Sequence, residues 1–224
     1  MRPKGMLRNI PYCVFRTQLR NTEYVTRNAQ YAKTMNREAA YSIVAEFVKN
    51  ENLIKHMLAV EAGMRAYAVK FGEDPDYWAL PGLLHDFDWE IHPNLDEHPM
   101  KGAPILRERG APEDVIRCIQ SHAPRTGVPR EKPMDYALYA VDELTGLITA
   151  CALVRPSRSL HDLTAKSVKG KWKDRAFAAG VNREDIEAGV KELGVDLTGH
   201  ITTVIEAMQT IAPQLGLDGS PATG

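Results

Sequence analysis

Three observations predict an all-α fold for most of this chain. From Met35 onward, apolar residues recur at spacings of three and four, which is the period of an amphipathic helix. The first two such segments lack the strict polar-apolar alternation of a half-buried strand. Proline and glycine stand between the periodic segments, where helices end and begin. The sequence therefore predicts a bundle of short helices.

The first predicted helices follow directly from this spacing. One spans about residues 40–48 and a second about residues 53–71, because in each the apolar positions fall on one helical face. Gly72 is placed to end the second helix. Pro75 then precedes a third helix, expected over about residues 76–89.

The middle of the chain contains three more predicted helices. Two of them flank the segment Gly110-Ala111-Pro112, and a proline-rich loop follows at about residues 124–133. The longest helix then covers residues 136–154 and is broken at Pro156. Its apolar composition indicates a central position in the fold.

The C-terminal part begins with a basic stretch over residues 166–175. Two helices are expected after it, over about residues 183–193 and 201–211. Asn182 and Asp196 are predicted N-caps, because their side chains can accept hydrogen bonds from the first free amides of a helix.

The domain organisation follows from this pattern. We expect a single helical domain over residues 35–215 and a flexible tail over residues 216–224. Residues 1–34 differ, because they contain seven basic residues and a single acid without sustained periodicity. Such a segment is typical of a transit peptide or of a leader upstream of a start at Met35. We expect it to be a non-essential extension, disordered or foreign to the native protein.

Composition excludes several classes of protein. With 44% apolar and 25% charged residues, the chain can bury a core and is not disordered. Its net charge of −1 gives no electrostatic footprint for nucleic acid, and no apolar run approaches the roughly 18 residues of a membrane span. Cys13, Cys118 and Cys151 are far apart and odd in number, which argues against disulfides and thiolate zinc sites. We expect a cytoplasmic monomer or homodimer without nucleic-acid or membrane partners.

The chemistry is carried by a series of four histidines and two aspartates. In chain order they are His56, His85, Asp86, His98, His122 and Asp142. Imidazole and carboxylate groups suit Fe, Mn, Co, Ni, Zn or Mg, and the absence of cysteine favours a catalytic ion over a structural one. Facing helices of a bundle can direct such ligands to one point. The other histidines, His92, His161 and His200, are expected to be ordinary surface or core residues.

The adjacent pair His85-Asp86 constrains this site. Neighbours on a helix point about 100° apart, so the pair reaches one ion only near a helix end, or else serves two ions. Two ions about 3.5–4 Å apart would share Asp86 as a bridging ligand.

The series resembles the HD-domain superfamily of metal-dependent phosphohydrolases, over roughly residues 52–150. The motifs that carry the resemblance are His56, Leu83-Leu84-His85-Asp86 and Val141-Asp142-Glu143-Leu144. His98 and His122 resemble the additional histidines of the binuclear branches of that superfamily. The resemblance implies a helical bundle with a metal site in its core, one or two divalent ions, and hydrolysis of a phosphate ester.

Two branches of the superfamily do not fit. Phe87-Asp88-Trp89 follows the pair where the HD-GYP branch has Ile-Gly-Lys, and the sequence has no Gly-Tyr-Pro element, so a cyclic dinucleotide is not the expected substrate. Trp89 stands where the nucleotidase branch has its glutamate. The chain most resembles stand-alone predicted HD hydrolases, for which the family supplies a reaction class and not a substrate.

We therefore expect hydrolysis of a small phosphate ester, a nucleotide or a phosphorylated metabolite, by metal-activated hydroxide. An ion lowers the pKa of its bound water from about 15.7 toward about 7. The first ion would be held by His56, His85, Asp86 and Asp142, and the second by Asp86, His98 and His122.

Residues outside this series have predicted roles in the same reaction. Asp88, Glu90 and Lys101 are close in sequence to the ligands, and Asp88 and Lys101 are predicted to assist catalysis. Asp88 or Glu90 would orient a ligand histidine through its free ring nitrogen or pass a proton to the leaving oxygen. Arg155 and Lys169 are predicted to bind the phosphate of the substrate. Two alternatives stay open, which are a nucleotide-sensing module without turnover and a di-iron oxygenase-type metalloenzyme.

Overall fold

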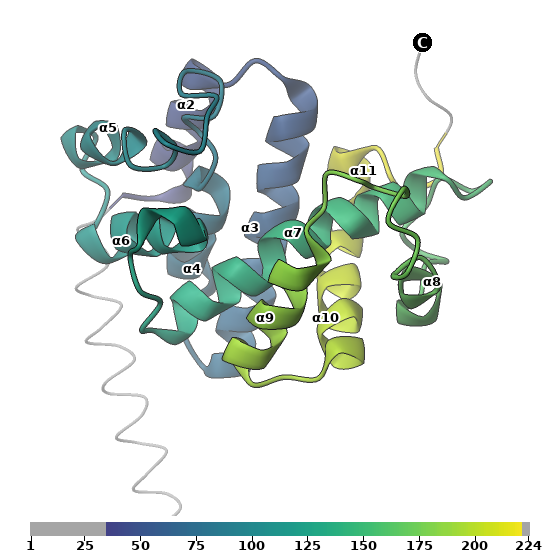
Figure 1. The fold of residues 1–224 in the computed structure, drawn as a ribbon. Coiled ribbons are helices and arrows are strands. Elements are labelled where there is room, and N and C mark those ends of the chain that lie inside the picture. The colour runs from purple at the N-terminus through teal and green to yellow at the C-terminus, as the bar shows by residue number, and fades with distance from the viewer. Residues whose placement is uncertain (1–34, 221–224) are drawn as a thin grey trace, which may run out of the picture. The chain divides into compact units, whose positions relative to one another are not determined.

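Helices account for all regular structure in residues 35–220, which are the residues that the computed structural model describes (Figure 1). This part of the chain contains ten α-helices, one short 3₁₀ helix and an isolated β-bridge between Ser159 and Asp218. The predicted all-α class is confirmed. The predicted N-terminal extension at residues 1–34 lies outside the described residues, as do residues 221–224.

The helices have the following bounds: α2 Arg37–Phe47, α3 Glu51–Phe71, α4 Pro75–Leu84, α5 Gly102–Glu108, α6 Glu113–His122, η1 Pro124–Thr126, α7 Pro133–Leu153, α8 Ala165–Gly170, α9 Arg183–Leu193, α10 Leu197–Gln209 and α11 Ala212–Leu215.

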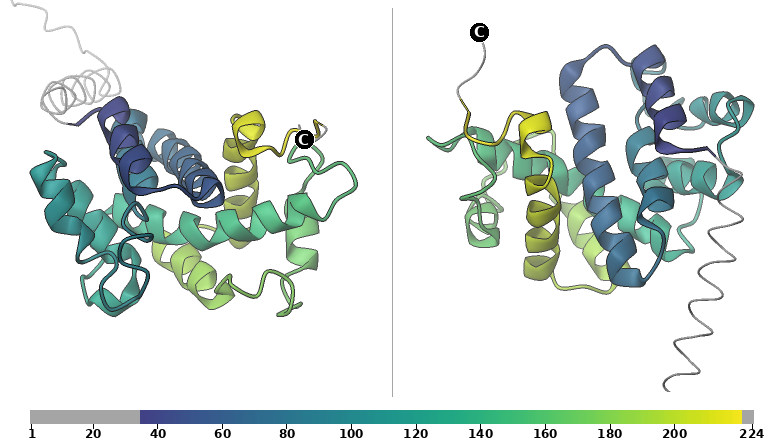
Figure 2. Two further views of the ribbon diagram at one scale, coloured as in Figure 1. Left: turned by 90° about the horizontal axis from the view of Figure 1, so that it is seen from above. Right: turned by 180° about the vertical axis from the view of Figure 1, so that it is seen from behind.

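Helix α3 follows the sequence pattern closely. Asn50 caps its start, with its side-chain oxygen accepting hydrogen bonds from the amides of Asn52 and Leu53. Gly72 ends it with a φ of 71°, a left-handed conformation that glycine adopts without a Cβ clash. One face of α3 packs on α4, while α7 and α10 also contact it (Figure 2).

Helix α4 is shorter than predicted and ends at Leu84 instead of residue 89. After that point the chain turns tightly, since the amides of Phe87 and Trp89 bond to carbonyls three residues back, at Leu84 and Asp86. His85 therefore lies at the helix end, where it and Asp86 can reach one ion.

Helix α7 is the central element that the sequence predicts, and it contacts α3, α6, α9 and α10. Figure 2 shows it passing beneath α3. By length and composition α7 could also cross a membrane, with a mean hydropathy of 1.2 over its best window. However, 61% of that window is buried inside the described domain, as in a core helix.

Helix α9 lies on α7 and forms one wall of the site described below. Its predicted N-cap is confirmed, because the side chain of Asn182 accepts from the amides of Glu184 and Asp185. The predicted N-cap of α10, Asp196, is confirmed in the same way by its bond from the Gly199 amide.

The loop before α9 is held by a buried cation. Arg183 is 2% exposed, and its guanidinium donates to four backbone carbonyls, at Asp174, Phe177, Ala178 and Val181. Because these bonds tie the loop to the start of α9, they fix the position of the wall that α9 provides.

The packed domain extends past residue 215, where the sequence analysis placed a flexible tail. Leu217 is 1% exposed, and its carbonyl accepts a hydrogen bond from the Leu160 amide at 2.8 Å. An apolar side chain in a run of Gly, Asp and Ser gives no periodic signal, so this contact could not be predicted from spacing.

Candidate metal centre

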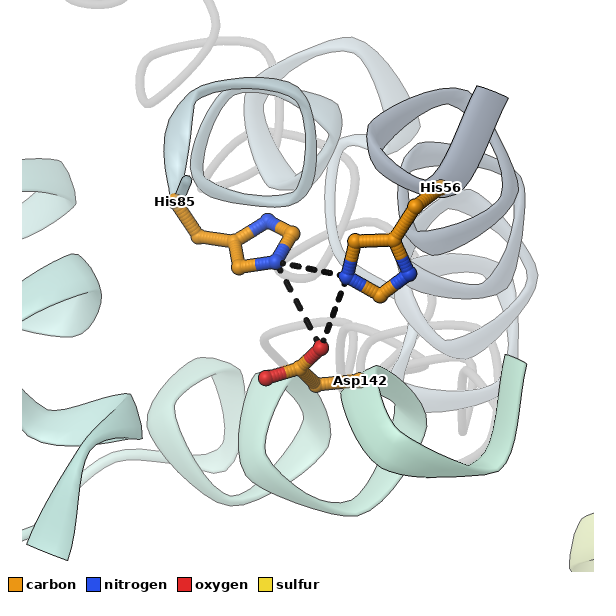
Figure 3. Close-up of side chains that lie close together, drawn as sticks. All are labelled: His56, His85 and Asp142. Carbon is orange, nitrogen blue, oxygen red and sulfur yellow. Dashed lines mark hydrogen bonds and ion pairs between the residues drawn. The ribbon is translucent and has the colours of Figure 1, made fainter. Parts of the chain in front are cut away.

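Three side chains from three helices meet at one point (Figure 3). His56 comes from the first half of α3, His85 from the end of α4, and Asp142 from the middle of α7. Asp142 Oδ1 lies 3.0 Å from His56 Nε2 and 3.4 Å from His85 Nε2. The two Nε2 atoms are 3.2 Å apart. Their ligand atoms all lie within 4.8 Å of one another, close enough to share an ion.

A second group of three lies beside the first. His98, from the turns before α5, has its Nε2 atom 3.2 Å from Asp86 Oδ1. His122, the last residue of α6, has its Nε2 atom 3.8 Å from the same oxygen and 3.4 Å from His98 Nε2. These three ligand atoms also lie within 4.8 Å of one another.

Asp86 joins the two groups through its two carboxylate oxygens. Oδ1 faces His98 and His122, whereas Oδ2 lies 3.6 Å from His56 Nε2 and 3.4 Å from His85 Nε2. The structure thus brings together all six residues that the sequence analysis selected, with Asp86 placed between them.

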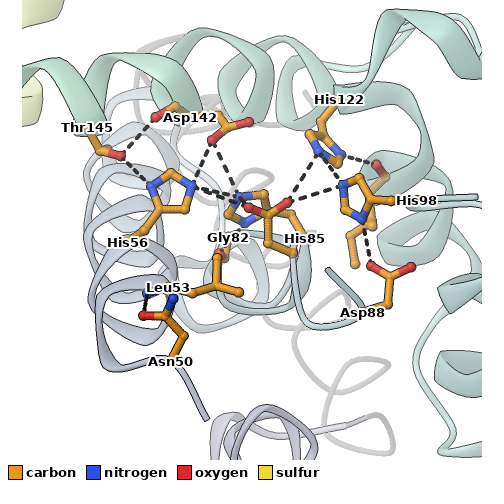
Figure 4. Close-up of polar contacts among 12 residues, drawn as sticks. Asn50, Leu53, His56, Gly82, His85, Asp88, His98, His122, Asp142 and Thr145 are labelled. Carbon is orange, nitrogen blue, oxygen red and sulfur yellow. Dashed lines mark hydrogen bonds and ion pairs between the residues drawn. The ribbon is translucent and has the colours of Figure 1, made fainter. Parts of the chain in front are cut away.

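The ring orientation of each histidine is set through Nδ1, on the side away from the cluster (Figure 4). His85 Nδ1 lies 2.9 Å from the Gly82 carbonyl oxygen, and His122 Nδ1 lies 2.5 Å from that of Ile119. A carbonyl oxygen can only accept, so both Nδ1 atoms carry the proton. In the neutral ring, each Nε2 therefore carries the lone pair and faces the cluster, which is the tautomer that a metal-binding histidine needs.

Side chains orient the other two rings. His98 Nδ1 donates to the buried carboxylate of Asp88 at 2.7 Å. His56 Nδ1 lies 3.2 Å from Thr145 Oγ1, and the Thr145 hydroxyl donates its own proton to the Asp142 carbonyl oxygen at 2.8 Å. The hydroxyl oxygen must then accept from His56, so His56 Nε2 also presents its lone pair to the cluster.

The electrostatics of the cluster favour positive charge. Burial lowers the pKa of His85, but the carboxylates of Asp86 and Asp142 outweigh it and hold that pKa well above its ordinary value. His98 behaves alike: burial opposes the charge, yet Asp86 and Asp88 raise its pKa to about 9. Although burial opposes their ionisation too, the histidines lower the pKa values of Asp86 and Asp142.

This donor set fits divalent cations. The cluster consists of imidazole nitrogens and carboxylate oxygens, with no sulfur, and its acceptor atoms face one another at 3.0–3.8 Å. Acceptors packed so closely repel one another unless protons or cations lie between them.

A cavity of about 590 Å³ opens above the cluster. Its floor includes five of the six residues, whereas His85 is completely buried beneath. Trp89 and Leu95 form an apolar part of the cavity wall. Arg125 also lines the cavity and brings a positive charge to it. A cavity of this size admits a small molecule.

Sequence reasoning missed several residues of this cavity: Arg125, Tyr139, Glu143, Asn182 and Asp185. Burial and the neighbouring Asp142 carboxylate raise the pKa of Glu143 to about 7. Its place beside Asp142 was a usable signal for Glu143, but Asn182 and Asp185 reach the cavity only because α9 packs on α7.

Of the two further catalytic residues that the sequence predicts, Asp88 has one of its two predicted roles, orienting a histidine, whereas the prediction for Lys101 needs correction. Asp88 is fully buried behind His98 and does not line the cavity, so it orients a histidine and cannot touch a substrate there. Lys101 is exposed and forms an ion pair with Glu97 one helical turn away. Being close in sequence to His98 does not direct a side chain toward the cluster.

The predicted phosphate-binding residues also lie elsewhere. Arg155 forms a two-pronged ion pair with Asp162 at 3.1 and 2.8 Å, just beyond the end of α7. Lys169 donates to Thr198 at 3.0 Å. Neither lines the 590 Å³ cavity. From Asp142, α7 continues for about three turns before it ends at Leu153, and Arg155 follows that end.

Comparison with known proteins agrees with this architecture. Residues 53–150 match the family model described as HD domain. No significant match was found among curated proteins or among solved structures. The matched segment contains all six residues of the cluster, and proteins with this domain bind divalent metals and are mostly metal-dependent phosphohydrolases. Residues 53–150 are therefore similar to an HD domain, which agrees with the resemblance that the sequence motifs indicate.

Proposed function

We propose that this protein is a metal-dependent phosphohydrolase that acts on a small phosphate ester, a nucleotide or a phosphorylated metabolite. One observation carries the proposal: all four histidines are tied to the protein through Nδ1, and all four Nε2 atoms face two carboxylates. The HD domain supports the same reaction class.

The residues divide into two sets of ligands. His56, His85 and Asp142 would hold one divalent ion, with Asp86 Oδ2 completing the set, and Asp86 Oδ1, His98 and His122 would hold the other. Divalent ions in such a site lower the pKa of water toward neutrality and offset the negative charge of a phosphoryl group.

The chain itself would bind and orient the substrate. Trp89 and Leu95 offer apolar surface to the organic part of the ester, and the 590 Å³ cavity limits its size. Arg125 lies at the cavity with an exposed ion pair to Asp96 at 3.0 Å, so it can exchange that partner for a phosphate oxygen.

Phosphate release tests the proposal. The purified protein is supplied in turn with Mn, Co, Ni, Mg and Fe(II) and offered a panel of nucleotides and sugar phosphates. We expect release that depends on the ion and disappears in Asp86→Asn. Asp162→Asn makes the same chemical change outside the cavity and should retain activity.

Other outcomes identify the alternatives. Tight binding of a nucleotide without turnover would point to a sensing module. Oxygen consumption by an iron-loaded protein, with no phosphate release, would point to oxidative chemistry instead.

A further inference from the structure

A second cavity, of about 920 Å³, lies next to the first. Its lining comes from the start of α3, the second half of α7, and the segment from Pro213 to Ser220. His56 and Gly146 line both cavities, so the second cavity adjoins the cluster at His56.

Two cations line the second cavity. Lys55 precedes His56 on α3, and Arg158 follows the end of α7. Neither side chain forms an ion pair with any residue in the described part of the chain, unlike Arg155 nearby, which is paired with Asp162. The ammonium of Lys55 faces the opposite wall, since a Cβ added at Gly216 would lie 3.8 Å from its Nζ.

The acidic residues of the cavity leave these cations available. Asp218 accepts hydrogen bonds from the Ser220 amide at 3.0 Å and the Ser220 hydroxyl at 2.8 Å. Glu51 lies in the first turn of α3, where a carboxylate is stabilised by the free amides of the helix. Both carboxylates thus have another source of stabilisation, and neither pairs with Lys55 or Arg158.

Arg158 also has an unusual backbone. Its φ is 46°, in the left-handed region that glycine occupies at lower cost. An arginine at such a position on a cavity wall suggests that the side chain is needed there for more than the turn.

We propose that the 920 Å³ cavity is a second subsite, which binds a remote phosphate group of the substrate through Lys55 and Arg158. Two cations match the nearly double negative charge of a phosphate near neutral pH better than the single charge of a carboxylate. The inference rests on the proposed function and narrows its substrate class to phosphate esters with a second phosphate.

Matched pairs of substrates test this assignment. Fructose 6-phosphate is compared with fructose 1,6-bisphosphate, and AMP with adenosine 3′,5′-bisphosphate. Lys55→Met and Arg158→Gly should each raise the KM for the bisphosphate about tenfold more than the KM for its monophosphate partner, because each removes a charged contact. Lys55→Arg keeps the positive charge, so its KM values for the bisphosphate and the monophosphate should stay close to those of the wild type.

Two controls separate binding from folding. Arg158→Gly suits the left-handed backbone, so its melting temperature should be unchanged or higher, and a rise in KM cannot be assigned to misfolding. Lys191→Met removes an exposed charge on α9 outside both cavities and should leave both KM values unchanged.

The outcomes distinguish the two proposals. If the protein hydrolyses esters but Lys55→Met and Arg158→Gly affect both members of each pair equally, the second subsite is overturned and the proposed function stands. If no ester is cleaved, the proposed function fails. The affinity for the uncleaved bisphosphates, measured by calorimetry, then takes the place of KM as the readout. Affinity that falls about tenfold in both variants would then support the subsite, and unchanged affinity would overturn it.

Discussion

His200 and the four histidines of the cluster are all packed among helices, yet they use their ring nitrogens differently. His200 accepts from the Tyr67 hydroxyl at Nδ1, over 2.5 Å, and donates from Nε2 to the Ala140 carbonyl at 2.8 Å. Both of its nitrogens thus end on neutral groups of the protein. In the cluster, Nδ1 of His56, His85 and His122 is also bonded to a neutral group and that of His98 to the Asp88 carboxylate, but every Nε2 faces carboxylates and other imidazoles.

This difference separates a histidine of the fold from a histidine of a site. Burial lowers the pKa of His200 to about 4, so the ring is neutral and satisfied. In the cluster, the nearby carboxylates instead raise the pKa of His85 and of His98 despite burial. The first arrangement needs nothing from outside, whereas the second attracts positive charge.

The largest expected effect is on activity and comes from Asp86, which belongs to both halves of the cluster. Asp86→Asn keeps the shape of the side chain but removes the shared charge. We expect phosphate release to fall about 1,000-fold, since electrostatic stabilisation by bound ions contributes several kcal/mol to such reactions. His200→Gln should retain activity. Equal losses of phosphate release in both variants would show that the core histidine and the cluster do not differ in function.

For stability, the larger effect is expected at His200 and not at the cluster. His200→Ala leaves the Tyr67 hydroxyl and the Ala140 carbonyl without partners in the core, and it opens a cavity. We expect the free energy of unfolding to fall by about 4 kcal/mol. Urea denaturation measures it, with the metal content of the folded variant unchanged. A variant as stable as the wild type would show that the His200 bonds contribute nothing to the fold.

The contribution of His200 to the free energy of unfolding should also fall as the pH is lowered. Its pKa is about 4 in the folded protein and about 6.5 when unfolded, so the unfolded state binds more protons between these values. Lowering the pH from about 6.5 to 4 in metal-free protein should therefore remove up to about 3 kcal/mol of stability that His200 contributes. Glu143, with a raised pKa of about 7, contributes in the opposite direction over much of this range. Asp86 and Asp142, whose pKa values are lowered, add their losses only below about 3.8.

His200→Gln is the control for this pH dependence. The difference in the free energy of unfolding between the wild type and this variant should change by up to about 3 kcal/mol between pH 6.5 and 4, since only the wild type has the titrating ring. Parallel profiles for variant and wild type would assign the slope to other groups, such as His122, whose pKa is lowered by burial and by His85.

A smaller effect is expected from the groups that orient the cluster. Thr145→Val removes the oxygen that accepts from His56 Nδ1, so the ring can adopt the tautomer that turns a proton into the cluster. We expect the affinity for a divalent ion to fall about tenfold. Thr145→Ser keeps the hydroxyl and should bind as the wild type does, and an unaffected Thr145→Val protein would contradict the assigned tautomer.

The smallest effect is expected at Lys101, which the sequence placed near the chemistry and the structure places at the surface. Lys101→Met removes only an exposed ion pair with Glu97. We expect kcat/KM to stay within about twofold of the wild type. A larger loss would show that Lys101 reaches the substrate in a state that this structure does not contain.

The parts of the fold that the sequence could predict are those set by local chemistry. Helix α9 was predicted with its correct bounds, Arg183–Leu193, because Asn182 caps its start and Gly194 follows its end. The end of α4 was predicted too late because turns with bonds three residues apart keep an apolar spacing similar to that of a helix.

The site was predictable to the extent that its residues occur as spaced motifs. The six residues of the cluster were selected because their types and order are informative together, and the structure brings them to one place. Thr145 was missed although it follows Asp142 by one helical turn on the same face of α7. Arg125 was missed because a cation in a short 3₁₀ helix within a proline-rich segment gives no periodic signal, and its position depends on tertiary packing.

Metal content tests the central claim most directly. Purified protein is equilibrated with Mn²⁺, passed through a desalting column and analysed for metal per chain, beside Asp86→Asn and His200→Gln. We predict close to two ions per chain in the wild type and in His200→Gln, and at most one in Asp86→Asn. A wild-type protein that is correctly folded and retains no Mn²⁺, nor any of the other ions, would contradict the assignment of the cluster as a metal centre.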